Sequence, residues 1–213
     1  MNKKHILKVL SELKKFFSDD DNQVLFLDHL TERVKLDYPD ETHKKNNDEF
    51  TLPDEFNDNI DGYALFADGA CRGNPGPGAW GAMGQNSKGE VLFTASGIEI
   101  LTTNNQMELE GAFQALQYLT QIDDFDIAKK VILFSDSRYV VDGVTKWIAG
   151  WEKRGWKKAD GKVPENLEQW KKLNELNAKF KSLEYKWVKG HAGHPQNEYC
   201  DELANNALDE SGF

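Results

Sequence analysis

Four acidic residues lie at positions from which a folded chain could gather them, although they are far apart in the sequence. Asp68 follows the short apolar run at 63–67, and Asp136 follows a second apolar run at 131–135. Glu108 and Asp201 fall within stretches with helical patterns. Carboxylates that are brought together repel one another, and at neutral pH they do not all stay ionised without a cation. The set therefore predicts a site for a hard divalent cation such as Mg²⁺.

The chemistry expected of such a site is phosphoryl transfer. Mg²⁺ commonly binds through a few carboxylates together with phosphate oxygens of a substrate. Two ions about 3.5–4 Å apart can activate a water and hold the leaving oxygen of an in-line displacement. Each acid alone also has a simpler interpretation, as a turn residue, a helix cap partner or part of a solvated helix face. Spacing alone therefore leaves the metal site open.

Hydrophobic patterns predict the elements that must position these acids. We expect strands over 63–68, 79–84, 91–97, 131–135 and 183–188. Helices are expected after the capping residues at 102–105 and over 137–149, 167–181 and 195–208. This order predicts an α/β fold with a mixed five-stranded sheet flanked by helices. Asp68 and Asp136 then stand at strand ends, where open α/β sheets build their sites.

The first 60 residues have a different character. Residues 1–36 read as a small helical extension, with apolar stripes such as Ile6, Leu10 and Leu13 in the first of two helices. Residues 37–60 read as an acidic linker, and residues 61–213 form the α/β domain. This first zone carries 9 basic and 14 acidic residues, so we do not expect it to grip nucleic acid. Its stripes need a partner, which could be the α/β domain, a second copy or another protein.

One stretch concentrates positive charge in a chain whose formal net charge is -10. Residues 144–162 contain six basic and two acidic residues, with Trp147, Trp151 and Trp156 interleaved. Basic side chains hold phosphates and aromatic rings cover sugars or bases, so the pattern favours nucleic-acid binding. An exposed helix and loop with core tryptophans is the other interpretation. The apolar runs are too short to span a bilayer, and we expect a cytoplasmic protein.

Four stretches resemble the motifs of type 1 ribonuclease H and occur in the same order. They read FADGACRGNPGPGAWGA at 66–82, TTNNQMELEGAFQAL at 102–116, LFSDSRYVVDGVTKWI at 133–148 and WVKGHAGHPQNEYCDELA at 187–204. The likeness covers residues 62–209 and resembles the bacterial form with a basic protrusion, here with an extra N-terminal segment. It implies a ribonuclease H-like fold and an endonuclease that cuts the RNA strand of RNA/DNA hybrids, leaving 5′-phosphate and 3′-hydroxyl ends.

The resemblance also implies roles for individual residues. Asp68, Glu108, Asp136 and Asp201 would bind two Mg²⁺ ions, which Mn²⁺ can replace, and His191 would act beside them in proton transfer or product release. The hybrid would be contacted by Cys71, Asn74, Thr103, Asn104, Asn105, Arg138 and Asn166. The DNA strand would lie over Trp147, Trp151, Lys153, Arg154, Trp156 and Lys157. Turn formation at Asn74 and helix capping at Asn104 and Asn105 are the alternatives from the residues themselves.

Three residues depart from the family pattern. Leu101 stands where an arginine of the phosphate pocket is frequent, Arg138 stands where an amide is common, and Glu152 reduces the positive charge of the basic segment. They predict weaker and more salt-sensitive hybrid binding than in a more basic relative. Other readings are a different nuclease of the same fold, such as a junction resolvase or integrase-like enzyme, a non-catalytic hybrid-binding module, and a regulator acting through its N-terminal helices.

Overall fold

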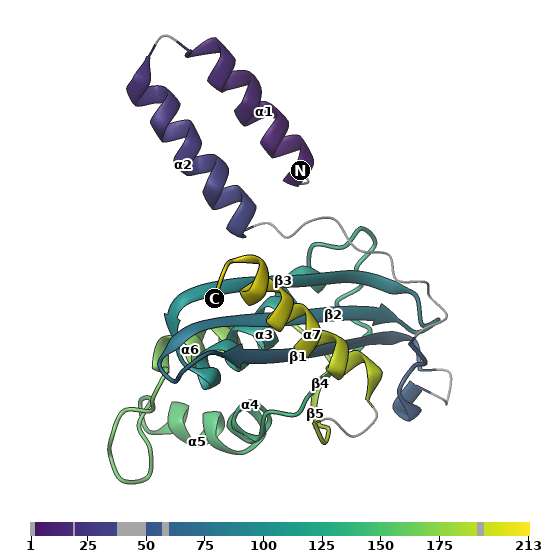
Figure 1. Ribbon diagram of the computed structural model, residues 1–213. Coiled ribbons are helices and arrows are strands. Elements are labelled where there is room, and N and C mark those ends of the chain that lie inside the picture. Colours follow the sequence, from purple (N-terminus) through teal and green to yellow (C-terminus); the bar gives the residue numbers. More distant parts are fainter. Residues whose placement is uncertain (1–2, 19, 38–49, 57–59, 191–193) are drawn as a thin grey trace. The chain divides into compact units, whose positions relative to one another are not determined.

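The computed structural model describes residues 3–18, 20–37, 50–56, 60–190 and 194–213 (Figure 1). The chain divides into two compact units, Met1–His43 and Lys44–Phe213. The first unit contains the helices α1 (Lys3–Phe16) and α2 (Asp21–Asp37), as the sequence predicts. Leu10 and Leu27 are its buried apolar residues among those described, and Lys14 pairs with Asp28 between the helices. None of the helices in the described ranges is long and apolar enough to cross a membrane.

The second unit is built on a mixed five-stranded sheet, as predicted. Its strands are β1 (Gly62–Cys71), β2 (Gly76–Asn86), β3 (Val91–Thr102), β4 (Lys130–Ser135) and β5 (Leu183–Trp187). They lie in the order β3-β2-β1-β4-β5. The pairs β1–β2 and β2–β3 are antiparallel, whereas β4 runs parallel to both β1 and β5. The carboxyl ends of β1 and β4 therefore meet at one edge of the sheet, which is where the first and third acids lie.

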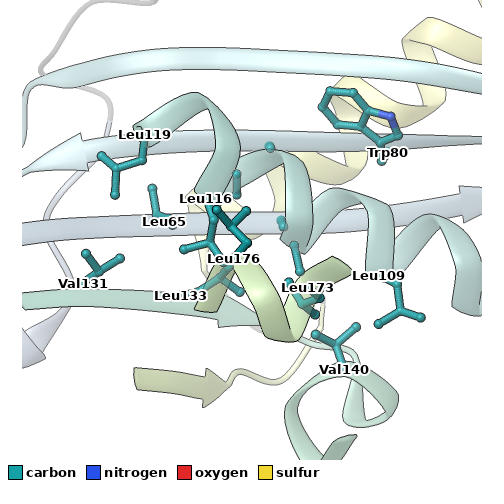
Figure 2. Packing of buried hydrophobic residues seen from close by; sticks show 14 of the residues in the cluster. Leu65, Trp80, Leu109, Leu116, Leu119, Val131, Leu133, Val140, Leu173 and Leu176 are labelled. Atoms are coloured by element: carbon teal, nitrogen blue, oxygen red, sulfur yellow. The ribbon is translucent and has the colours of Figure 1, made fainter. Parts of the chain in front are cut away.

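Alternation along β1 divides the core into two clusters on opposite faces of the sheet. Leu65 and Ala67 belong to the larger cluster with α3 (Asn104–Leu119) and α6 (Leu167–Asn177), part of which Figure 2 shows. Ala64 and Phe66 point the other way, into a smaller cluster with α7 (Pro195–Glu210). Figure 1 shows α7 crossing the face opposite α3. Successive strand residues face opposite sides, so β1 lends one wall to each cluster.

The segment after β4 forms one helical run instead of the shorter helix expected over 137–149. It comprises α4 (Arg138–Asp142), a π-helical turn (Gly143–Trp147) and α5 (Ile148–Lys153). Two other elements also exceed their expected limits, because β2 begins at Gly76 and β3 continues to Thr102, and these residues pair with each other. The glycines of this region favour turns on their own, but pairing with the strands on both sides holds them in β2.

The prediction of a linker over residues 37–60 does not hold for its second half. Phe50 and Phe56 are each only 5% exposed and belong to the cluster beneath α7. A short 3-10 turn (Asp54–Phe56) ends this segment. Residues 50–56 therefore pack as part of the second unit, whereas 38–49 and 57–59 lie outside the described residues.

Candidate active site

Asp68 and Asp136 stand on neighbouring strands just beyond a shared register position. Phe66 of β1 pairs with Phe134 of β4, and each acid follows its phenylalanine by two residues. The two rings stack with centroids 5.1 Å apart, which fixes the strands at this point. Asp68 is 9% exposed and its Oδ1 accepts a 2.7 Å hydrogen bond from the amide of Gly69. A buried carboxylate within β1, just beyond the last residue that pairs with β4, is thus the centre of the site.

The third acid, Glu108, reaches the site because α3 begins against β1. A Cβ at Gly69 would lie 2.4 Å from the backbone nitrogen of Glu108, so only glycine permits this approach. The Glu108 carboxylate accepts hydrogen bonds from Ser137 Oγ at 2.5 Å and from Asn104 Nδ2 at 2.9 Å. Ser137 also caps α4 by accepting from the amide of Val140. Glu108 is therefore held from both its own helix and the start of α4.

The fourth acid, Asp201, comes from α7 on the other face of the sheet. A Cβ at Gly81 of β2 would lie 2.0 Å from the carbonyl oxygen of Cys200, so the helix rests directly on the strand backbone. Asn205, one turn further along, donates from Nδ2 to the Asp201 carboxylate at 2.8 Å. Two glycines, one under each helix, thus bring α3 and α7 close enough to β1 for all four acids to interact.

Burial and mutual repulsion raise the pKa values of the central acids. Burial is the largest cause of the rise in the pKa of Asp68 to about 8, and repulsion by Asp136, Asp201 and Glu108 adds to it. The pKa of Glu108 is also raised, chiefly by burial, although its bond from Ser137 acts in the opposite direction. The pKa of Asp68 responds to all three other acids, so the sequence prediction that folding gathers them is supported by the electrostatics of the site.

The carboxylates suit a hard cation, although the described residues do not form a complete metal site. Within the described residues, no three histidine, cysteine or acidic groups are arranged to hold a metal ion. Asp68 and Glu108 instead accept bonds from neighbouring amides and a hydroxyl. The available ligands are carboxylate oxygens, the type that Mg²⁺ prefers, and a cation would relieve the repulsion that raises the Asp68 pKa.

The residues expected to contact a hybrid gather around the start of α3. Asn74 Oδ1 accepts from the backbone amide of Asn104 at 3.3 Å, so the Asn74 side chain lies at the start of α3. Thr103, rather than Asn104 or Asn105, caps α3 through a capping box with Gln106. Cys71 is partly exposed, and its Sγ lies 3.5 Å from the carbonyl oxygen of Thr102. Asn105 is partly buried in the first turn of the same helix.

Trp187, a residue that the site prediction did not include, links Arg138 to the acid site. The guanidinium of Arg138 is 3.6 Å from the ring centroid of Trp187, whose Nε1 donates to the carbonyl oxygen of Asp136 at 2.9 Å. Ser137 was also missed, although its place directly after Asp136 and before a helical pattern is typical of an N-cap. The signal for Trp187 was weaker, since a tryptophan near a strand end is more often a packing residue.

The basic segment is divided between the core and the surface. Trp151 is 7% exposed and packs edge-on against Trp170, so most of its ring is unavailable to a ligand. The prediction that Trp151 contacts DNA is corrected here. Trp151 is a core residue, and one edge of its ring lines a cavity of about 300 Å³. Trp147 and Trp156 are partly exposed. The exposed cations of the segment are Lys146, Lys153, Arg154, Lys157 and Lys162. Asn166 donates to the hydroxyl of Tyr139 at 3.1 Å.

His191, expected beside Asp201, lies outside the described residues, as do its neighbours 192 and 193.

Comparison with known proteins places this architecture among characterised enzymes. The family model described as RNase H matches residues 61–209. Ribonuclease H of Maricaulis maris is 49% identical over 148 residues, which cover 69% of this chain and 93% of that protein. Ribonuclease H of Erwinia tasmaniensis is 47% identical over 154 residues, covering 70% of this chain and 94% of that protein. The solved structure of LC11-RNase H1 in complex with RNA/DNA hybrid is 27% identical, with a TM-score of 0.57, and the match covers 70% of this chain and 98% of that one.

Proposed function

The chain belongs to the RNase H family, and on this basis we propose that it hydrolyses the RNA strand of RNA/DNA hybrids endonucleolytically, by a two-metal-ion mechanism. The products would carry 5′-phosphate and 3′-hydroxyl ends. The observation that carries this proposal is the electrostatic coupling of Asp68 to three other acids, with its pKa raised to about 8. A protein that only bound a polyanion would gain nothing from an acidic cluster at its binding surface.

Asp68, Glu108, Asp136 and Asp201 are the residues that would hold Mg²⁺ or Mn²⁺. When bound, the ions supply Lewis-acid activation of a water and stabilise the leaving oxygen. The chain's own residues do the positioning: Asn104 and Ser137 orient Glu108, and Asn205 orients Asp201. Such supporting bonds fix the direction of a metal ligand and tune its affinity.

For proton transfer we propose His191. An imidazole with an ordinary pKa near 6.5 exchanges a proton at neutral pH. The second histidine of the motif, His194, is the N-cap residue of α7, and we assign it a structural role. Replacing His191 with alanine should lower kcat while hybrid affinity stays the same. A loss of affinity with unchanged kcat would contradict this role.

The hybrid would be recognised by two groups of side chains. RNA is distinguished by its 2′-hydroxyls in the wide minor groove, and amides such as Asn74 and Asn104 can both donate to and accept from them. Cys71, Asn105 and Arg138 border the same region in the sequence motifs. We assign the DNA strand to Thr103, Asn166 and the exposed part of the basic segment, namely Trp147, Lys153, Arg154, Trp156 and Lys157.

A substrate panel tests the proposal. Labelled RNA/DNA hybrid, duplex RNA and duplex DNA, each with and without Mg²⁺, should yield cleavage of the hybrid's RNA strand alone, and only with the metal. Terminal phosphate mapping should place the phosphate on the 5′ side of each cut. Preferential cutting of branched duplex DNA would instead favour the junction-resolvase reading, and hybrid binding without cleavage would favour a binding module.

We also propose that the helical hairpin formed by α1 and α2 pairs with a second copy of itself. Phe16, Leu25 and Phe26 are 81%, 65% and 58% exposed, which leaves an apolar surface without a cover in the described unit. By sequence, α1 carries five lysines and one glutamate, whereas α2 carries four acidic and two basic residues. A second copy turned by half a rotation offers each helix a partner of opposite charge and an equal apolar face.

Light scattering of the full chain and of a variant lacking residues 1–43 tests this pairing. The full chain should have twice the mass of one copy, and the shortened variant should be a monomer that keeps its cleavage activity. Phe16→Ser combined with Phe26→Ser should also give a monomer. A monomeric full chain would contradict self-pairing and leave the surface to another protein.

A further inference from the structure

Residues Phe50–Phe56, which we call the strap, precede the matched residues 61–209 yet pack as core. The rings of Phe50 and Phe56 are 5% exposed within the cluster that also contains Phe66, Phe134 and Tyr199. These are the residues of β1 and β4 that lead to Asp68 and Asp136, together with one residue of α7. The strap therefore fills the space beneath α7 with two aromatic rings that come from outside the family's usual boundaries.

Two buried glutamines connect the strap to the rest of the unit by hydrogen bonds. Gln85 of β2 is fully buried, and its Nε2 donates to the carbonyl oxygens of Phe50 at 3.2 Å and Gly89 at 2.9 Å. Gln196 of α7 is 4% exposed, and its Nε2 donates to the carbonyl oxygen of Thr51 at 2.5 Å and to Gln85 Oε1 at 3.1 Å. Buried amides need such partners, so the strap completes a network that would otherwise be left partly unsatisfied.

This network ends at the first turn of α7. Among the described residues, the N-cap His194 makes no side-chain capping bond, so the start of the helix is fastened through Gln196 instead. One turn further, Tyr199 packs against Phe50 with ring centroids 5.3 Å apart. Asp201 follows Tyr199 by two residues. On the sheet side, the close contact of Cys200 with Gly81 fixes the same turn.

A fourth contact extends the strap to the edge of the sheet. Lys186 of β5 donates to Glu55 at 3.1 Å, and both side chains are partly buried. The strap thus touches β2, β5 and α7, the last of which carries Asp201. Because the strap contacts two strands as well as α7, it holds this helix against the sheet and restricts both the rotation and the tilt of the helix.

We propose that the strap is a positioning element of the active site: Phe50 and Thr51 hold the first turns of α7 and thereby place Asp201 against Asp68. Phe50 acts through Tyr199, and Thr51 acts through Gln196. This inference rests on the proposed function for its effect on catalysis, although its structural part is independent of it. The functional nuclease domain of this chain then begins at residue 50.

The test compares Phe50→Ala with Phe180→Ala in the full chain. Phe180 is 8% exposed and packs against Phe125 in the larger cluster, away from the cluster that contains α7. The two variants remove the same group from similarly buried places. Hydrogen exchange over 195–204 needs neither metal nor substrate. We expect faster exchange there in Phe50→Ala and wild-type exchange there in Phe180→Ala.

Cleavage of the hybrid supplies the second readout. We expect kcat of Phe50→Ala to fall about tenfold, the size usual for residues that support a metal ligand, while KM stays the same. Phe50→Leu should recover most of the activity, and Gln196→Ala should reproduce the loss. If Phe50→Ala does not fold, Gln196→Ala carries the comparison with Phe180→Ala.

The two ways of failing can be told apart. If the wild-type chain does not cleave the hybrid, the proposed function fails, and the exchange experiment still decides whether the strap holds α7. If exchange over 195–204 and kcat change equally in the Phe50→Ala and Phe180→Ala variants, the strap contributes only general stability and the inference is overturned.

Discussion

The guanidinium of Arg138 lies over the indole of Trp187, 3.6 Å from the ring centroid, and the indole nitrogen donates to the carbonyl oxygen of Asp136. The cation is therefore held beside the acid site by stacking and does not move freely in solvent. An arginine in this place can bind a phosphate of the hybrid with two parallel hydrogen bonds.

We predict that Arg138→Gln weakens hybrid binding without abolishing cleavage. One lost phosphate contact should lower the slope of log affinity against log salt by about 1. KM measured at several salt concentrations checks this. Lys158→Gln serves as a cation control from the basic segment. A variant whose KM and salt slope equal those of the wild type would exclude a phosphate contact for Arg138.

The raised pKa of Asp68 predicts an unusual pH dependence of stability in the absence of metal. The pKa rises from an ordinary value of 3.8 to about 8, so between these values the folded state holds a proton that the unfolded state releases. Stability of the metal-free protein should therefore fall as pH rises through this window. Asp68→Asn removes the titration and should be more stable than wild type at pH 8, with a smaller difference at pH 5.

Thermal unfolding in EDTA at both pH values measures that difference. Added Mg²⁺ should stabilise the wild type more at pH 8 than at pH 5, because the metal needs the ionised carboxylate. Asp68→Asn also removes the repulsion between Asp68 and the other three acids, which adds to the gain at pH 8. A difference between Asp68→Asn and wild type that is independent of pH would contradict the raised pKa.

Ser137 has two separable roles. Its hydroxyl caps α4 and also donates to Glu108. We expect Ser137→Ala to cost about 1 kcal/mol of stability from the cap and to lower kcat by about tenfold from the loss of an orienting bond. Ser137→Thr should retain both functions. Chemical denaturation and steady-state kinetics measure the two effects, and a loss of stability with wild-type kcat would show that Glu108 does not depend on this bond.

Leu101 offers a gain-of-function test of the salt-sensitive binding that the sequence predicts. Its side chain is 73% exposed near the end of β3, so a larger polar residue disturbs no packing. Leu101→Arg should lower KM for the hybrid and make cleavage less sensitive to added salt. Ile100→Arg, at a neighbouring position that is 68% exposed, is the matched control for a general charge effect. Equal gains in both variants would argue against a specific phosphate pocket.

Most of the sheet could be predicted from the sequence because its strands have clear local patterns. The run at 131–134 is apolar throughout, as expected for the interior strand β4, and the alternation of Leu65 with Phe66 reflects two buried faces. The four acids were proposed because two follow apolar runs and the motifs supplied the others. Local order and the motif contexts together were enough for the architecture, and the roles of the four acids stay a prediction.

The strap could not be predicted because its contacts are distant in sequence. Phe50 and Phe56 are isolated apolar residues in acidic surroundings, with no helical or strand period. The glutamine that bonds to Phe50 follows it by 35 residues, and the one that bonds to Thr51 follows it by 145. The role of Trp151 was likewise undecided, since a tryptophan among lysines suits both a DNA contact and a core position. Only the packing against Trp170 separates these two possibilities.

The most direct test of the metal centre is the Mg²⁺ dependence of hybrid cleavage in two glutamate variants of α3. Glu108→Gln removes a proposed ligand, whereas Glu110→Gln changes a residue that bonds to Gln114 along the same helix. We expect Glu108→Gln to lose about 100-fold or more in kcat, as when a main stabiliser of transition-state charge is removed, and Glu110→Gln to match the wild type. Full Mg²⁺-dependent activity in Glu108→Gln would contradict the account.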